Sequence, residues 1–383
     1  MPRPITLAAA GVLALLAHPV LAGEIRYDTP EALGEALFFD VNLSRDRTQA
    51  CATCHNPDFG FADPRETEPG GAVSLGDDGQ SLGNRNAPTA SYAALTPEFH
   101  RSPGGQWIGG QFLDGRAANL AEQAGGPPLN PVEMGMPDKA SVVARLAENP
   151  DYVAAFDYLY GAGVLEDAEA GYAAMTESIA AFERTDLFAP FDSKYDRYLR
   201  GEYQLTQEEE LGRLLFFSQQ FTNCNMCHQL GKSQMDPRET FTNYQYHNIG
   251  VPVNAAVRVA NGSAPEHVDR GLLENPAVED PGEAGKFKVP TLRNVAVTGP
   301  YMHNGVFQDL RTVVLFYNKY NSTDPARQIN PETGAPFGPP EVDGTLSMKE
   351  LTTGPALDDQ RIDALVAFLE TLTDQRYEHL LGD

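Results

Sequence analysis

Two five-residue stretches of this chain share one pattern, CATCH at residues 51–55 and CNMCH at residues 224–228. The 383-residue sequence has four cysteines, and these two stretches contain all of them. In each stretch two thiols stand three positions apart, and a histidine follows the second thiol directly. A pair of cysteines alone does not explain a histidine in the same place twice.

The amino-terminal segment decides which cysteine chemistries are open to the chain. Arg3 precedes an apolar run over residues 5–17, and a small-residue site ends at Ala22. This order is typical of a secretory signal peptide. An uncleaved membrane anchor is the alternative, but the run is short for a bilayer span and His18-Pro19 interrupts it. We therefore expect residues 1–22 to be removed and the mature chain to be periplasmic, without a membrane span.

The composition excludes some partners. The formal charge is −25, and removal of the signal takes away one arginine and no acid, leaving 27 basic and 53 acidic residues. Phosphate backbones are bound by Lys and Arg, so such an acidic chain is a poor nucleic-acid binder. With 42% apolar residues the chain can bury real cores, and its length suggests two domains or three small ones.

The cysteine pairs have several possible uses in an exported protein. Disulfides are permitted there, a CxxC pair can be a redox dithiol, and two pairs can bind zinc. Zinc pairs normally lie within a few tens of residues, whereas these lie about 170 apart, and a disulfide needs no histidine. CxxCH is the pattern of covalent c-type haem, in which both thiols bond the haem and the histidine binds its iron. We therefore expect two covalent haems, attached through Cys51, Cys54 and His55 and through Cys224, Cys227 and His228.

A repeat around the motifs predicts the fold class. LGEALFF (33–39) precedes the first motif and LGRLLFF (211–217) precedes the second, and each reads as an amphipathic helix with a buried Phe pair. Repeats this far apart indicate duplicated domains. We predict a mainly α protein with long loops, a boundary within residues 186–206, and two haem domains at residues 23–195 and 196–383.

The sixth iron ligand separates electron carriers from enzymes. No histidine lies between His55 and His100, and no methionine lies between Met1 and Met134, so we expect the first haem to lack a strong distal ligand. The segment 112–135 supplies Gln123 and Glu133 near this open face. Bound peroxide needs a proton moved between its oxygens, which suits a carboxylate, although an ordinary surface Glu is an equally good interpretation of this residue alone.

The motifs together resemble those of the bacterial di-haem cytochrome c peroxidase and MauG family. The matching stretches cover nearly all of the mature chain: LGEALFFD, CATCH, GNRNAPT (83–89), FLDGRA, EQAGGPPLNPVEM, CNMCH, FTNYQYHNIGVP (241–252) and KVPTLRNVAVTGPYMHNGVF (288–307). The resemblance implies two cytochrome c-like α domains with a calcium ion between the haems. It makes the first haem the one that reacts with hydrogen peroxide, with Glu133 as acid/base and Gln123 beside it. It implies calcium ligands from Asn86, Thr298 and the backbone carbonyl of Pro300, an oxygen set that suits this cation.

One position distinguishes the branches of this family. The peroxidases close the second haem with a methionine 14 residues after the His of their Pro-Tyr-x-His motif, and MauG has a tyrosine ligand there. Here that His is His303, and the residue 14 positions later is Tyr317. A thioether raises the iron potential, whereas a hard anionic phenolate favours the higher oxidation states. Met302 and Met348 are the rival ligands, and a core aromatic is the structural alternative for Tyr317.

Two further departures bear on coupling between the haems. Residues 56–99 lack the histidine with which many of the peroxidases block the first haem, which again is similar to MauG. Most relatives have a tryptophan between the haems where this chain has Leu113, and the only tryptophan is Trp107. Either Trp107 or a tyrosine substitutes, or the two irons are less tightly coupled.

Three functions remain open from the sequence. The leading prediction is a MauG-like enzyme that uses hydrogen peroxide to oxidise a protein partner. The second is a cytochrome c peroxidase that takes electrons from a small periplasmic cytochrome or cupredoxin. The third is a non-catalytic di-haem electron carrier, which would need both irons to be six-coordinate.

Overall fold

The computed structural model describes residues 25–382 except for residues 232, 234 and 237. The predicted signal peptide, residues 1–22, lies outside the described residues. The fold is mainly helical, as predicted, with short two-stranded antiparallel pairs and long loops. Among the helices in the described part of the chain, none has the length and apolar character to cross a membrane.

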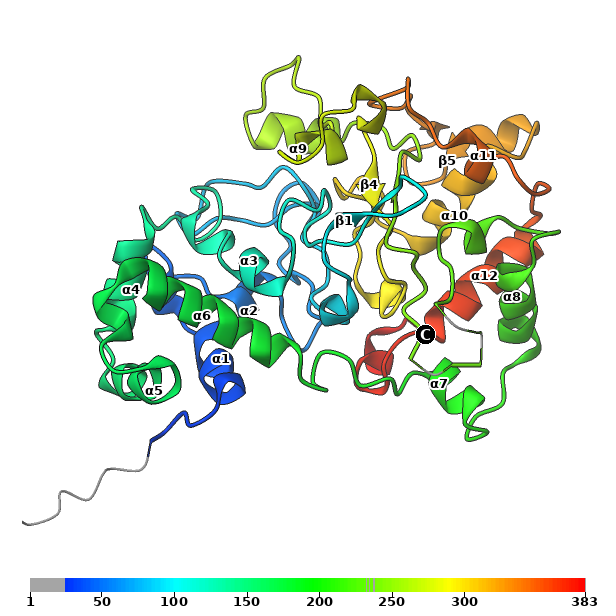
Figure 1. Cartoon of the computed structure of the whole chain (residues 1–383). Helices are drawn as coiled ribbons and strands as arrows, with labels where there is room; N and C mark the ends of the chain where they lie inside the picture. Colours follow the sequence, from blue (N-terminus) through cyan, green and yellow to red (C-terminus); the bar gives the residue numbers. More distant parts are fainter. Residues whose placement is uncertain (1–24, 232, 234, 237, 383) are drawn as a thin grey trace, which may run out of the picture.

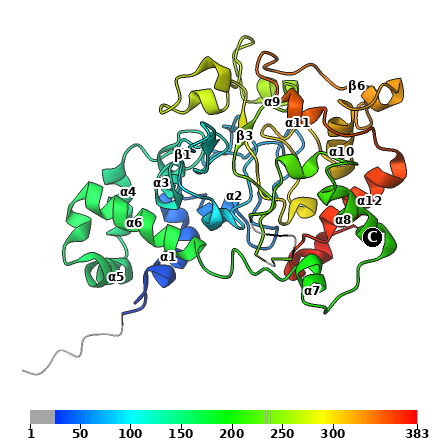
Figure 2. The ribbon, with the colours of Figure 1, turned by 45° about the vertical axis from the view of Figure 1, so that its right-hand side comes forward.

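The helices gather in two groups (Figures 1 and 2). The first group is α1 (Pro30–Phe38), α2 (Cys51–Cys54), α3 (Leu120–Ala124), α4 (Lys139–Leu146), α5 (Pro150–Tyr160) and α6 (Ala168–Glu183). The second is α7 (Lys194–Leu199), α8 (Gln207–Phe217), α10 (Leu310–Asn318), α11 (Met348–Leu351) and α12 (Asp359–Glu370). Helix α9 (Ala255–Ala260) lies apart from α8, α10 and α12 in Figure 1, and its Val257 packs against Ala72 and Val73. The strand pairs are β1 (His100–Arg101) with β2 (Trp107–Ile108), β3 (Tyr246–His247) with β4 (Phe287–Lys288), and β5 (Ile329–Asn330) with β6 (Ala335–Pro336).

The same helix crossing occurs in each group. Helix α1 packs against α6, and α8 packs against α12. At each crossing the glycine of the sequence repeat faces the backbone of the partner helix. A Cβ on Gly34 would lie 1.9 Å from the carbonyl oxygen of Ser178, and a Cβ on Gly212 would lie 1.8 Å from that of Ala364. The repeated LGxxLFF stretches therefore build equivalent pairs of closely packed helices.

The prediction of a buried Phe pair in each repeat was wrong for one residue. Phe38 and Phe216 are buried, and Phe217 is partly buried against the second core. Phe39, however, is 46% exposed. Consecutive residues of a helix point about 100° apart, so two neighbours rarely both face a single core.

Two hydrophobic cores hold these groups together. The first core runs from Leu33 to Phe188 along the chain, and the second from Tyr195 to Leu372. The N-terminal half and the C-terminal half each contribute one of them, and long loops lie between the two helix groups in Figure 1. The domain limits at residues 195 and 196 stay a prediction.

Candidate functional site

The first CxxCH motif holds its histidine through a backbone carbonyl. Cys51 and Cys54 lie on α2, and His55 ends this helix. The His55 Nδ1 lies 3.2 Å from the carbonyl oxygen of Phe61. Burial lowers the pKa of His55, which favours the neutral ring. A neutral imidazole that donates from Nδ1 presents its Nε2 lone pair to a metal.

The second motif repeats this arrangement. The His228 Nδ1 lies 2.9 Å from the carbonyl oxygen of Phe241, and burial lowers the pKa of His228 to about 4. Phe61 and Phe241 both have left-handed backbones, with φ of 54° and 57°. Such angles are uncommon for residues with a Cβ and often mark functional positions. Sequence reasoning missed this pair, since no local pattern predicts a left-handed phenylalanine.

A cavity of about 360 Å³ adjoins the second motif. Its walls include Cys224, Cys227 and His228, and Tyr317 reaches it from α10. Burial raises the pKa of the Tyr317 phenol, and the nearby thiols of Cys227 and Cys224 add to this. The structure therefore brings Tyr317 and the second attachment motif together in one cavity.

The rival methionine ligands lie in different surroundings. Met302 lines the same cavity, with a left-handed φ of 71°. Met348 begins α11, is 44% exposed and is absent from the cavity wall. His247 and His303 also line the cavity, and sequence reasoning gave neither a role, although both stand in stretches that carry the family resemblance.

Glu133 lies near the first motif. Burial raises the pKa of its carboxyl, and Arg116 partly offsets this effect. Burial raises the pKa of the Cys54 thiol to about 11, and the Glu133 charge adds a smaller contribution in the same direction. Gln123 belongs to α3, and its backbone carbonyl accepts the Gly126 amide at 2.9 Å. Within the described residues, the Gln123 and Glu133 side chains form no hydrogen bond with each other.

The three residues expected to bind calcium line the cavity of the second motif. Asn86 comes from the N-terminal half, and Thr298 and Pro300 come from the C-terminal half. The Asn86 amide donates to the His303 carbonyl at 2.8 Å, and its Nδ2 donates to the Ala72 carbonyl at 3.1 Å. The Thr298 hydroxyl donates to the Asn294 carbonyl at 3.1 Å. Oxygen ligands from side chains and backbone are the type that Ca²⁺ prefers.

Comparison of the chain with known proteins identifies its family. A family model described as di-haem cytochrome c peroxidase matches residues 29–204. The chain is 59% identical over 356 residues to the methylamine utilization protein MauG of Paracoccus denitrificans, covering 93% of this chain and 91% of that protein. The chain belongs to the di-haem cytochrome c peroxidase family. It is therefore an oxidoreductase that uses peroxide, and the family implies two c-type haems.

Other members differ more. The chain is 33% identical over 290 residues to the cytochrome c peroxidase Ccp of Escherichia coli, covering 76% of this chain and 53% of that protein. Among solved structures, the diheme peroxidase BthA of Burkholderia thailandensis is 36% identical, with a TM-score of 0.80 and coverage of 94% and 89%. A MauG-like protein associated with microbial copper homeostasis is 30% identical, with a TM-score of 0.65 and coverage of 92% and 91%.

The residues around the second cavity fit a haem. The Nε2 atoms of His247 and His303 are buried and have no hydrogen-bond partner within the described part of the chain. Both histidines line the cavity, whose other walls are largely apolar. Buried polar atoms without partners are costly, so these nitrogens call for a polar ligand group. A haem would offer apolar faces to the walls and two carboxylates to such donors.

Proposed function

We propose that this chain is an exported, MauG-like enzyme. It takes oxidising equivalents from hydrogen peroxide at a haem held by Cys51, Cys54 and His55, and passes them through a second haem to a protein partner. The observation that carries this proposal is the place of Tyr317 in the cavity of the second attachment motif. The 59% identity to MauG of Paracoccus denitrificans supports the same branch.

The first site needs a group that moves a proton. Haem iron supplies the redox chemistry with peroxide when the group is bound. Glu133 would take the proton from one peroxide oxygen and return it to the other, with Gln123 nearby as a polar neighbour. Burial raises the pKa of Glu133, so its carboxyl holds a proton at higher pH than an exposed glutamate does. His55, whose Nδ1 faces the Phe61 carbonyl, would bind the iron through its other ring nitrogen.

The second site decides where the oxidising equivalents go. A His228/Tyr317 pair would stabilise the oxidised iron, so that electrons from a small cytochrome would enter unfavourably. The site would then store an oxidising equivalent for a protein partner that docks on the enzyme. Met302 in the same cavity favours a second candidate function, cytochrome c peroxidase with a small periplasmic cytochrome or cupredoxin as the electron donor.

Three supporting assignments belong to the same proposal. Asn86, Thr298 and the Pro300 carbonyl would bind one calcium ion and join the two halves of the chain. Residues 1–22 would be the signal peptide that directs the chain to the periplasm. The two haem domains would occupy residues 23–195 and 196–383.

The second haem ligand tests the proposal. In the purified di-haem protein, Tyr317→Met should raise the midpoint potential of the second haem and make reduction by a small cytochrome favourable; each 59 mV corresponds to tenfold in this equilibrium. Haem attachment should survive, because it depends on Cys224, Cys227 and His228. The matched control Met302→Leu should leave the potential and the spectrum unchanged. A methionine-ligand spectrum in the wild type that Met302→Leu abolishes would overturn the tyrosine assignment in favour of the peroxidase.

A further inference from the structure

The wall of the second cavity has an aliphatic residue, Leu113, at the position where the family resemblance implies a tryptophan between the haems. Trp107 does not replace it. Its ring stacks on Phe99, with centroids 4.8 Å apart, and it does not belong to the cavity wall. Another group must connect the two sites if oxidising equivalents pass between them, as the proposed function requires.

A short backbone segment leads from the first histidine to the second cavity. The Phe61 carbonyl that faces His55 also accepts the Ala90 amide at 3.1 Å. Two residues further along the chain, Tyr92 lines the second cavity. Tyr92 is 1% exposed, and its backbone has a left-handed φ of 62°, which is uncommon for a residue with a Cβ. Tyr92 therefore stands between the ligand shell of one haem site and the wall of the other.

Tyr92 has a proton acceptor in direct contact. Its hydroxyl donates to the Asp374 Oδ1 at 2.6 Å, across the two halves of the chain. The other oxygen of Asp374 accepts the Asn294 Nδ2 at 2.8 Å, which fixes the carboxylate. Burial raises the pKa of Asp374 to about 6, so the group is ionised at neutral pH yet accepts a proton more readily than an exposed aspartate. A phenol bonded to such a base can lose an electron and a proton together.

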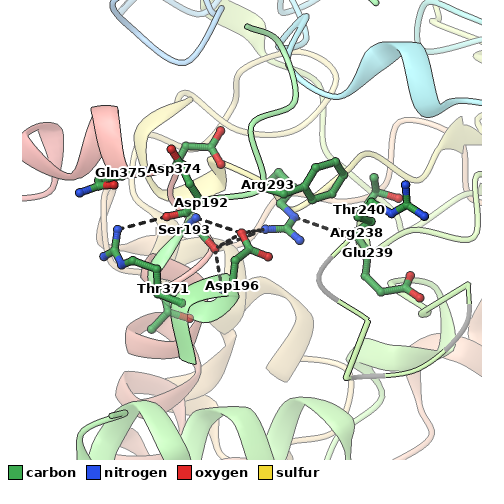
Figure 3. Close-up of polar contacts among 12 residues, drawn as sticks. Asp192, Ser193, Asp196, Arg238, Glu239, Thr240, Arg293, Thr371, Asp374 and Gln375 are labelled. Carbon is green, nitrogen blue, oxygen red and sulfur yellow. Dashed lines mark hydrogen bonds and ion pairs between the residues drawn. The ribbon is translucent and has the colours of Figure 1, made fainter. Parts of the chain in front are cut away.

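Arg293 lies between Tyr92 and the residue that faces the second histidine. Its guanidinium carbon lies 5.4 Å from the ring centroid of Tyr92 and 5.2 Å from that of Phe241, whose carbonyl faces His228. The Arg293 side chain is fully buried and forms an ion pair with Asp196 at 2.5 Å (Figure 3). This fixed cation opposes a positive charge on Tyr92, so oxidation of the ring requires departure of its proton.

We propose that Tyr92 and Asp374 form a proton-coupled redox relay between the two haem sites. One electron leaves Tyr92 for the site that peroxide has oxidised, and the phenolic O–H bond breaks. The proton moves along the 2.6 Å hydrogen bond and forms an O–H bond on Asp374, which leaves a neutral tyrosyl radical beside a neutral carboxylic acid. An electron from the second haem site then reduces the radical, and the proton returns to the phenol. Hydrogen peroxide is the oxidant, and the relay rests on the proposed function.

The chain offers a matched control for this relay. Tyr377 is also 1% exposed and also donates across the two halves of the chain, to the Pro57 carbonyl at 2.8 Å. A carbonyl accepts a hydrogen bond but takes up no proton at neutral pH. Tyr377→Phe therefore removes an equivalent structural hydrogen bond without touching a proton acceptor. Thermal unfolding of Tyr92→Phe and Tyr377→Phe shows how much each change affects folding.

The test follows the di-haem protein after one equivalent of hydrogen peroxide, by stopped-flow absorbance of each haem and by freeze-quench electron paramagnetic resonance. We expect the transfer of oxidising equivalents between the haems to be slower in D₂O. In Tyr92→Phe and in Asp374→Asn the transfer should slow at least about tenfold, which is a smaller effect than positioned proton acceptors typically have. Tyr377→Phe should match the wild type. The tyrosyl signal should be absent from Tyr92→Phe, weakened in Asp374→Asn, where the proton acceptor is lost, and unchanged in Tyr377→Phe.

Each of these measurements can overturn the proposed relay. Equal rates in Tyr92→Phe and Tyr377→Phe, or a wild-type rate unchanged in D₂O, would overturn it, and the D₂O measurement needs no variant. Failure of the proposed function appears separately, because the second haem of the wild type would then show no spectral change with peroxide, and this result would overturn the relay as well. If both haems of the wild type respond and the variants do not differ, only the relay fails.

Discussion

Replacing Gly212 with alanine should destabilise the protein, although alanine is the better helix former. Gly212 lies within α8, where alanine would by itself gain about 0.8–1.0 kcal/mol. The added Cβ would, however, lie 1.8 Å from the Ala364 oxygen and 2.6 Å from its carbonyl carbon. Both are backbone atoms of α12, so no side-chain rotation relieves the clash, and the two helices must separate.

The net effect follows from these two opposing contributions. Overpacking typically costs about 1–3 kcal/mol, occasionally more, and a clash with helix backbone belongs at the upper end. After subtraction of the helix preference, a loss of about 2 kcal/mol remains. For a domain of 150–250 residues this corresponds to a fall in melting temperature of roughly 4–8 °C. Thermal unfolding of the di-haem protein, followed by circular dichroism and by haem absorbance, measures this change.

An open glycine serves as the control. A Cβ added to Gly344 would meet no heavy atom within 4 Å, and the residue has no left-handed φ, so Gly344→Ala should change stability by no more than about 0.5 kcal/mol. Gly34→Ala should behave like Gly212→Ala, because its Cβ would lie 1.9 Å from the Ser178 oxygen. A melting temperature for Gly212→Ala equal to or above that of the wild type would refute the packing argument for the second helix pair.

Three further changes test the two haem sites and the first core. Acid–acetone extraction should leave both haems on the chain, and Cys227→Ser should loosen or remove about half of the haem absorbance; release of all colour from the wild type would contradict covalent attachment. Glu133→Gln should slow the reaction with peroxide, since acid–base groups typically contribute roughly 10²–10⁴-fold, and unchanged stopped-flow kinetics would exclude Glu133. Burial raises the pKa of the Glu183 carboxyl to about 8, above its value in the unfolded chain, so its contribution to the free energy of unfolding is lost as the pH rises toward 8. Glu183→Gln should therefore reduce the fall in melting temperature between pH 5 and pH 8. An unaltered pH profile would contradict this.

The sequence alone predicted the features that local chemistry determines. A histidine directly after each CxxC pair indicated haem, and the LGxxLFF repeat predicted the mainly α fold. The glycine of that repeat proved to be the contact point of each helix crossing. Phe39 shows the limit of this reasoning, because the pattern identified an apolar pair but not which member of it faces the core.

Contacts between distant parts of the chain could not be predicted. Tyr92 and Asp374 are 282 positions apart, and their hydrogen bond exists only because the two halves of the chain pack together. The carbonyls that face His55 and His228 come from residues 6 and 13 positions away, so sequence spacing does not relate them. Phe61 and Phe241 both have left-handed backbones, which depend on tertiary packing, and in each site the phenylalanine carbonyl faces the histidine in the same way.

The two haem sites are alike in the residues of the repeat and its attachment motif. They differ in the residues that other segments contribute. In both, a histidine follows the attachment cysteines and faces a phenylalanine carbonyl, so this part cannot account for different reactivity. The difference must come from residues outside the repeat. Under the proposed function this difference would come from Glu133 near the first motif, whose carboxyl suits proton transfer, and from Tyr317, which reaches the second cavity from α10. A duplicated domain could thus acquire two roles through these few contacts, while the helix crossings that support both haems stayed the same.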